Sequence, residues 1–233
     1  MSSRIEELDW QPTPIGEISL RRRVEPTLGV DVFEVRLGEE FLMSSLFTVA
    51  EVELARLGLA ACGDRQLDVV VGGLGLGWTA REALQDSRVR SLTVVETLGA
   101  VIGWHQRGLL PHAAELVDDQ RTTMVEADFF ALAAAGALPG PSDAVLLDVD
   151  HSPRHVLHPS HAAFYSADGL RRMTAGLHPG GVLALWSDDP PDEPFQAVLA
   201  EVFATTAAHV VPFPNHHTGG TSTNTVYVAT TAR

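Results

Sequence analysis

The chain has 233 residues, enough for one full hydrophobic core or for one domain with a small appendage. Its 30 acidic and 16 basic residues give a formal net charge of −14, which excludes nucleic acid and anionic membrane surfaces as expected partners and suits a small cationic substrate such as an amine. Cys62 is the only cysteine, the first residues carry no secretory pattern, and no apolar run has membrane-spanning length, so we expect a cytoplasmic protein without an intrachain disulfide.

The first 48 residues are predicted to form a small antiparallel β unit. Apolar and polar side chains alternate over residues 17–24 and 30–37, with glycine-containing turns beside them. This pattern predicts a hairpin or meander, and we divide the chain into a β region, 1–48, and a larger domain, 49–233. Exposed strands of this kind offer a possible homodimer contact.

A helix is expected directly after this β unit. Thr48 and Glu51 have the spacing of a capping box, in which each side chain bonds the backbone of the other. Leu54, Leu57 and Leu59 then supply an apolar face, and the helix should end before residue 63.

From residue 67 onward, strand patterns alternate with helix patterns. Several strand cores are continuous apolar runs, such as residues 69–71, 145–147 and 182–186, which is typical of a parallel sheet buried on both faces. The expected strands are 67–71, 92–96, 122–126, 144–148 and 182–186. The expected helices are 78–86, 99–108, 128–136, 166–176 and 194–204.

Two late strand patterns, 209–213 and 225–229, are joined by a loop too short for a helical crossover. They should therefore pair antiparallel with each other. A mostly parallel seven-stranded α/β sheet that ends in such a hairpin is typical of the class I, Rossmann-like methyltransferase architecture that uses S-adenosylmethionine, whereas a dinucleotide-binding fold more often closes with another helix.

A glycine-rich turn follows the first strand of this sheet and contains Gly73, Gly75 and Gly77. Glycines at such a turn let the backbone approach a nucleotide-type ligand, and Glu96, at the end of the next strand, is placed to accept hydrogen bonds from ribose hydroxyls. The segment from Gly75 to Ala80 also satisfies the G-x-G-x-x-A form of the dinucleotide fingerprint, so a nicotinamide-dependent oxidoreductase remains an alternative. A tight turn without a ligand is the simpler structural explanation.

Acidic side chains also end the third and fourth strands. Asp128 is a candidate partner for an adenine amino group and, equally, a candidate N-cap of the next helix. Asp148, Asp150 and His151 follow the fourth strand, where ligands of parallel sheets bind, so we expect them to contact cofactor or substrate and to take a proton from an amine. Capping of the loop by short polar side chains is the alternative.

The loop after the fifth strand is acidic and rich in proline. Trp186, Asp188 and Asp189 are candidates for the wall of a pocket that holds a cation, and a solvated loop with a capping acid is the alternative.

Four histidines, His151, His155, His158 and His161, have helical spacing that resembles a metal site. Prolines interrupt that helix, so we favour packing or substrate contact and predict no metal.

The chain resembles the spermidine synthase (polyamine aminopropyltransferase) family, a branch of the class I methyltransferase fold. The resemblance covers nearly the whole chain and lies in the glycine loop that leads to residues 79–82, the strand end 94–96, the Phe-Tyr pair 164–165 and the turn 177–182. It implies a nucleoside sulfonium cofactor, either S-adenosylmethionine or its decarboxylated form, and a role for Tyr165 beside the substrate. The cofactor residues that it implies are Gly73, Gly75, Gly77, Glu96 and Asp128.

Two positions depart from the family pattern. Leu76 stands where the family's glycine loop carries an aspartate, and, with Asp148 aligned to the first acid of the family's D-x-x-D-P loop, His151 stands at the second. Because those acids serve aminopropyl transfer, the sequence slightly favours methyl transfer from S-adenosylmethionine to a small amine. Aminopropyl transfer from decarboxylated S-adenosylmethionine is the close alternative, and a non-catalytic homologue is a further one.

Overall fold

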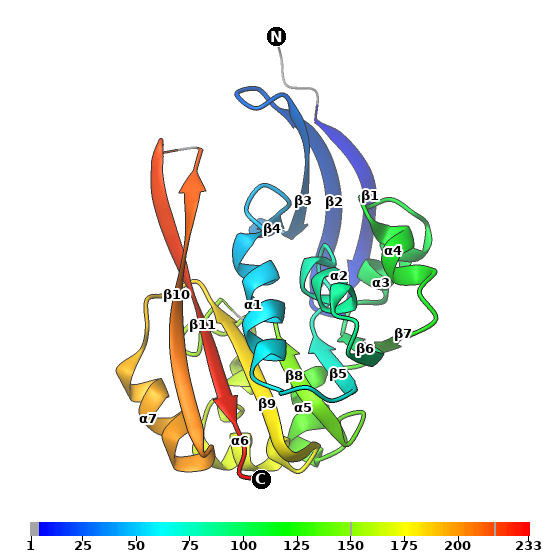
Figure 1. Ribbon diagram of the computed structural model, residues 1–233. Helices are drawn as coiled ribbons and strands as arrows, with labels where there is room; N and C mark the ends of the chain where they lie inside the picture. The colour runs from blue at the N-terminus through cyan, green and yellow to red at the C-terminus, as the bar shows by residue number, and fades with distance from the viewer. Residues whose placement is uncertain (1–4, 150, 217) are drawn as a thin grey trace.

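A computed structural model describes residues 5–149, 151–216 and 218–233 and contains two β-sheets (Figure 1). The N-terminal sheet is antiparallel with the strand order β1-β2-β3-β4, which confirms the predicted meander. Its buried side chains include Ile18, Leu20 and Val35, which join the core of the larger sheet. Its strands are β1 (Glu6–Thr13), β2 (Gly16–Glu25), β3 (Val30–Leu37) and β4 (Glu40–Ser44).

The larger sheet has seven strands in the order β10-β11-β9-β8-β5-β6-β7. The strands from β9 to β7 pair parallel, whereas β11 pairs antiparallel with both β9 and β10. The predicted parallel sheet with a C-terminal antiparallel hairpin is therefore confirmed. Its strands are β5 (Leu67–Gly72), β6 (Val89–Glu96), β7 (Thr122–Glu126), β8 (Ser142–Leu147), β9 (Leu177–Ser187), β10 (Thr205–Asn215) and β11 (Gly220–Thr230).

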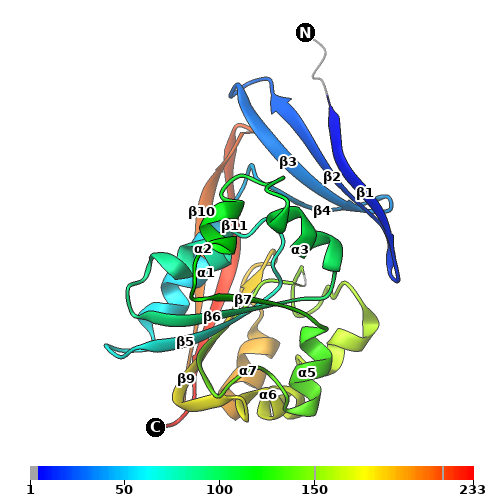
Figure 2. The same ribbon diagram turned by 90° about the vertical axis from the view of Figure 1, so that its right-hand side faces the viewer.

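Helices cover both faces of this sheet, as Figure 2 shows. Helices α1 to α4 pack on one face together with the N-terminal sheet, and α5 to α7 pack on the other. The helices are α1 (Val49–Ala60), α2 (Trp78–Gln85), α3 (Gly99–Gln106), α4 (Ala113–Val117), α5 (Phe129–Ala135), α6 (Ala167–Thr174) and α7 (Glu193–Val202), with a 3₁₀ turn at Pro159–Ala163. The short α4 was not predicted.

The continuous apolar runs form strands because both faces of the sheet are covered. In β5, Val69 and Val71 pack in the α1–α4 layer, whereas Val70 packs in the α5–α7 layer. Successive side chains of a strand point to opposite faces, so a strand buried on both sides needs apolar residues at every position.

The predicted capping box at the start of α1 is wrong. The Thr48 side chain makes no capping hydrogen bond, and the Glu51 side chain lines a cavity at the end of the sheet. The helix begins at Val49, a few residues after β4 ends, and its buried side chains pack against the sheet. Local spacing could not reveal that Glu51 faces this cavity rather than the Thr48 backbone.

The N-terminal sheet is tied to the larger one by polar contacts as well as by its core. The Trp104 indole N–H donates to Asp9 Oδ2 at 2.6 Å, and Arg107 forms an ion pair with the same carboxylate. These contacts lower the pKa of Asp9 against the effect of its partial burial. The division into domains at residue 48 stays a prediction.

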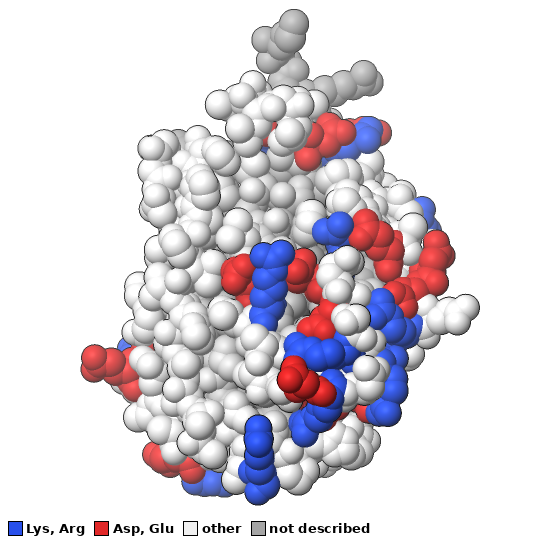
Figure 3. Space-filling model, viewed as in Figure 1, with Lys and Arg blue, Asp and Glu red and all other residues white. Residues whose placement is uncertain are grey.

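Charged side chains are unevenly spread over the face seen in Figure 3, where arginines and acids gather on one side and interleave there. Ion pairs link neighbouring helices: Arg56 of α1 pairs with Glu82 of α2, and Arg81 of α2 pairs with Glu115 of α4. None of the helices described is long and apolar enough to span a bilayer.

Candidate active site

A cavity of about 400 Å³ lies at the carboxyl ends of the parallel strands. This is the edge at which open α/β sheets bind their ligands. Its walls come from the N-terminal sheet, α1, the glycine loop, the loops after β8 and β9, and the β10–β11 hairpin. The lining residues are Phe41, Leu42, Met43, Ser44, Phe47, Glu51, Leu74, Gly75, Leu76, Gly77, Trp78, Asp148, Val149, His151, Leu157, Trp186, Asp188, Phe213 and Asn224.

The glycine loop between β5 and α2 forms the floor of this cavity. Gly73 and Gly77 have φ angles of +90° and +88°, which disfavour residues with a Cβ. A Cβ on Gly73 would also lie 2.2 Å from the Asp148 carbonyl oxygen. These glycines therefore permit both the turn itself and its close approach to the neighbouring strand end.

His105 of α3 supports the loop from beneath and was not predicted. Its Nε2 donates to the Gly75 carbonyl oxygen at 3.0 Å, while its Nδ1 is buried and finds no partner among the described residues. Burial lowers the pKa of His105, because the charged imidazolium would lose its hydration there. A neutral imidazole thus fixes the loop carbonyl.

Glu96 lies at the end of β6, as predicted, and its carboxylate bonds the backbone at the start of the glycine loop. Its two oxygens accept from the backbone N–H groups of Leu74 and Leu98 at 2.9 and 2.8 Å. Burial raises the pKa of Glu96, and these backbone donors oppose the shift. A carboxylate has further acceptor positions for a ribose diol, so its predicted role stays open.

Asp148 follows β8 and lies at the cavity wall, as its place in the sequence predicted. The Thr79 hydroxyl donates to Asp148 Oδ2 at 2.8 Å. Burial raises the pKa of Asp148 to about 6, against the effect of that hydrogen bond. No described arginine reaches this carboxyl group, so it faces the cavity as an acid that titrates near neutral pH.

Glu51 is the acid that sequence analysis assigned to a helix cap and that the structure brings to the same cavity. Burial, followed by repulsion from Asp148, raises the pKa of Glu51 to about 8. The Thr79 hydroxyl lies 3.4 Å from the Glu51 carbonyl oxygen as well as beside Asp148, so α1 and the β8 end meet at this threonine.

The opposite wall contains predicted and unpredicted residues together. Trp186 and Asp188, predicted from the acidic loop, line the cavity, and Asn224 of β11 donates to Asp188 Oδ1 at 2.7 Å. The indole N–H groups of Trp78 and Trp186 are buried without a partner among the described residues. Buried donors of this kind normally find an acceptor, so these two N–H groups are unusual.

Other predicted residues lie outside this lining. Asp128 caps α5, accepting from the N–H groups of Phe130 and Ala131, which agrees with its alternative role. Asp189 pairs with His155 at 2.9 Å beside a separate surface pocket. Tyr165 is buried against the Phe195 ring, and its substrate role stays a prediction.

Asp150 lies outside the described residues. Its neighbour His151 is at the cavity rim, where Nε2 is 3.4 Å from Glu40 Oε1. Of the other clustered histidines, His158 bonds the Ser160 hydroxyl, and His161 stacks on Phe130 with 3.8 Å between ring centroids. His158 and His161 are neighbours, with 5.9 Å between ring centroids, whereas His151 and His155 contact Glu40 and Asp189.

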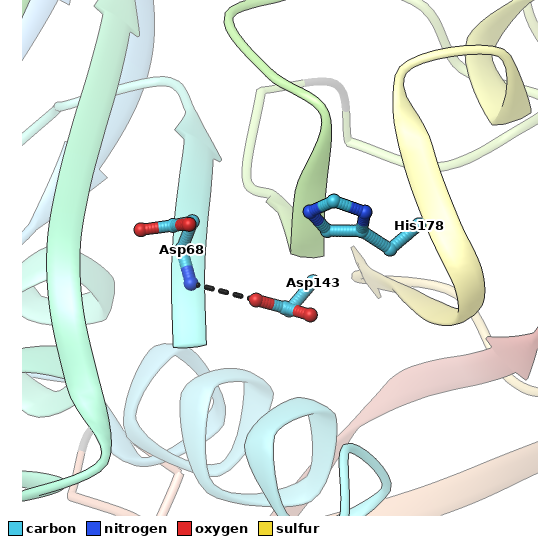
Figure 4. A group of neighbouring side chains, drawn as sticks. All are labelled: Asp68, Asp143 and His178. Carbon is cyan, nitrogen blue, oxygen red and sulfur yellow. Dashed lines mark hydrogen bonds between the residues drawn. The ribbon is translucent and has the colours of Figure 1, made fainter. Parts of the chain in front are cut away.

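A different set of metal-ligating types comes together at the opposite edge of the sheet. Asp68, Asp143 and His178 lie near the starts of β5, β8 and β9 (Figure 4). Asp143 Oδ2 accepts from the Asp68 backbone N–H at 2.9 Å, and Arg65 and Arg90 pair with the two carboxylates. These acids are already neutralised by arginine.

The main cavity has a different electrostatic character. Its described lining includes Glu51, Asp148 and Asp188 and contains no lysine or arginine. Its remaining walls are largely aromatic and aliphatic. Such a site favours a cation with an apolar part and offers no lysine or arginine to an anion.

No protein-family model matches the chain, and no curated protein matches it in sequence. Among solved structures, it is similar to spermidine synthase from Thermotoga maritima and to a spermidine synthase in complex with the transition state analogue AdoDATO. In both cases the TM-score is 0.73, the sequence identity is 17%, and the match covers 96% of this chain and 72% of the other. At this identity the likeness shows the fold: the chain has the α/β fold of the spermidine synthases.

Proposed function

We propose that this protein is an aminopropyltransferase that moves the aminopropyl group of decarboxylated S-adenosylmethionine to an amine. The observation that carries the proposal is the cavity beside the glycine loop, whose described lining holds three acids and no lysine or arginine. The likeness to spermidine synthases, one of them in complex with AdoDATO, supports the same choice.

The residues at the cavity fit a nucleoside sulfonium donor. The glycine loop presents backbone to the cavity, and Glu96, which lies outside the described lining, accepts from two backbone N–H groups at the start of this loop and after β6. The donor supplies a carbon bonded to a positively charged sulfur, which leaves as a neutral thioether. The chain therefore needs to align the two substrates, exclude water and take a proton from the amine.

The acidic lining distinguishes the decarboxylated donor from S-adenosylmethionine itself. The intact donor carries a carboxylate, which would enter a cavity whose acids include Glu51 and Asp148. The decarboxylated donor presents only an ammonium group, which the same acids attract. Methyl transfer, which the sequence favoured because of Leu76 and His151, is therefore the second choice.

Isothermal titration calorimetry with three separate ligands tests the proposal. Decarboxylated S-adenosylmethionine should bind at least tenfold more tightly than S-adenosylmethionine, and NAD should give no heat. Incubation of the protein with the decarboxylated donor and 1,4-diaminobutane should then release methylthioadenosine, detected by mass spectrometry. Tighter binding of S-adenosylmethionine would restore methyl transfer as the first choice, and binding of NAD alone would indicate an oxidoreductase.

A further inference from the structure

We infer that His105 is a positioning residue for the nucleoside part of the donor. Its hydrogen bond to the Gly75 carbonyl turns the next backbone N–H, that of Leu76, toward the cavity, where this N–H donates to a ribose oxygen. The inference rests on the proposed function. It adds a residue of α3 that lies outside the described lining and acts on the ligand only through the glycine loop.

The first observation concerns the backbone N–H groups of the glycine loop, residues 73–77. Leu76 is 8% exposed and lines the cavity, and its N–H has no hydrogen-bond partner among the described residues. The other loop N–H groups have partners: those of Gly73 and Gly77 bond backbone carbonyl oxygens, and those of Leu74 and Gly75 face the Glu96 carboxylate. Because enclosed backbone donors are normally paired, the Leu76 N–H is left for a ligand.

The second observation is the direction of the peptide between Gly75 and Leu76. It is the central peptide of a tight turn, which the Gly77 N–H closes by donating to the Leu74 carbonyl oxygen at 2.8 Å. The peptide is trans, so its carbonyl and its N–H point in opposite directions. His105, 2% exposed, bonds the carbonyl from the core side, and the N–H therefore points to the side on which the cavity lies.

The third observation is how closely the loop rests on this histidine. A Cβ on Gly77 would lie 2.8 Å from His105 Cε1, so the loop backbone sits directly on the ring. The Nε2 nitrogen carries the proton, because a carbonyl oxygen can only accept. Nδ1 is then a buried acceptor without a described partner, which destabilises the fold. A residue needed only to fill this space would not have to carry that destabilising group, so the bond to the loop explains the histidine.

A ribose matches the groups that the loop presents. The Leu76 N–H is a neutral donor, and the Glu96 carboxylate at the start of the same loop is an acceptor. Ribose hydroxyl groups both donate and accept hydrogen bonds, so one sugar can use both. If His105 did not hold the Gly75 carbonyl, the peptide could rotate and the N–H would no longer face the sugar.

The experiment compares H105Q, H105N and H105A by calorimetric titration with methylthioadenosine, which has the ribose and adenine of the donor but no charged group. A glutamine amide nitrogen takes the place of Nε2, whereas an asparagine amide nitrogen takes the place of Nδ1. Only H105Q can therefore keep an N–H donor at the Gly75 carbonyl. Its affinity should stay within about threefold of the wild type, whereas H105N and H105A should each bind about tenfold more weakly.

Kinetics separate positioning from a general loss of structure. In H105N the KM for decarboxylated S-adenosylmethionine should rise about tenfold, and kcat at saturating donor should fall less than about threefold, because the bound ligand restores the loop. H105Q should recover most of the wild-type KM. A fall in kcat with an unchanged KM would overturn the inference.

Amide hydrogen exchange of the free protein provides a measurement that needs no ligand. Peptides that span residues 73–77 should exchange faster in H105N than in H105Q, with circular dichroism verifying that both variants fold. Equal exchange, or equal methylthioadenosine affinity in the two variants, would overturn the inference alone. A wild type that binds neither methylthioadenosine nor decarboxylated S-adenosylmethionine would overturn it together with the proposed function. If H105A does not fold, the comparison of H105Q with H105N decides the result.

Discussion

Acidic side chains cluster at both ends of the parallel strands of the seven-stranded sheet, but the two clusters have different partners. At the edge where the parallel strands begin, Asp68 and Asp143 are paired with Arg90 and Arg65 (Figure 4). At the edge where the strands end, Glu51 and Asp148 face a cavity whose described lining contains no arginine. The same side-chain type is thus neutralised within the protein at one edge and left for a ligand at the other.

The difference shows in the pKa values. Arg90 holds the pKa of Asp68 below its usual range, so this carboxylate stays ionised. Burial without an arginine instead raises the pKa of Asp148 to about 6 and that of Glu51 to about 8. Acids with raised pKa values in a cavity are typical of sites that exchange protons with a substrate, whereas arginine-paired acids are typical of structural contacts.

The largest effect that follows from this contrast is on catalysis by D148N. The substitution removes the carboxylate that accepts the proton but retains an oxygen for the Thr79 hydroxyl. We expect kcat/KM for aminopropyl transfer to fall on the order of 10² to 10⁴-fold, measured as methylthioadenosine release at saturating donor. A variant with wild-type turnover would remove Asp148 from the mechanism.

The next effect is a gain of stability in E51Q that depends on pH. The pKa of Glu51 is raised from 4.5 to about 8, so folding favours its protonated form. That contribution is fully present below pH 4.5 and is lost as the pH rises through about 8. The Tm of E51Q should therefore exceed that of the wild type by roughly 5 °C at alkaline pH and should equal it in acid.

Differential scanning calorimetry across this pH range provides the measurement. E53Q is the control, because Glu53 lies on the same helix, pairs with Arg56 and is not part of the described lining. A Tm difference for E51Q that stays constant with pH would show that the Glu51 carboxyl group does not carry a raised pKa.

At the opposite edge, D143N should reduce stability without affecting catalysis. The buried Asp143 carboxylate accepts from the Asp68 backbone N–H and pairs with Arg65. An asparagine keeps an acceptor oxygen but loses the negative charge. A cost of about 1 kcal/mol lowers the Tm by roughly 3 °C. Turnover at permissive temperature should equal that of the wild type, and a large drop in kcat would give this edge a role in the reaction.

The smallest effect belongs to R90A at the same edge. Arg90 is largely exposed, and surface ion pairs contribute about 0 to 1 kcal/mol. We expect a Tm within roughly 2 °C of the wild type and an unchanged affinity for n-butylamine. A loss of amine affinity in R90A would mean that the two edges are coupled.

Much of the fold could be predicted from the sequence, because the signals are local and repeated. Runs such as residues 69–71 and 145–147 require burial on both faces, and the short loop between the last two strands requires an antiparallel hairpin. The positions of the glycine turn, Glu96 and Asp148 follow from the ends of predicted strands, and their roles stay predictions.

The rest of the site depends on packing between distant segments. An acidic residue at position 51 has a local explanation, a capping box or the helix dipole. Its place in the cavity depends instead on the packing of α1 over β8 and β9. Phe47 and Phe213 reach the cavity from the chain after β4 and from the β10–β11 hairpin. His105 carries no motif, since its role arises only where α3 passes beneath the glycine loop.

The most direct test of the account is a crystal structure of the protein soaked with 1,4-diaminobutane. The account predicts one amine nitrogen within about 3 Å of a carboxyl oxygen of Asp148, with the carbon chain on the aromatic wall. A diamine seated instead against Asp68 and Asp143, or in the main cavity with no contact to Asp148, would contradict the central claim that the two sheet edges are divided between binding and structure.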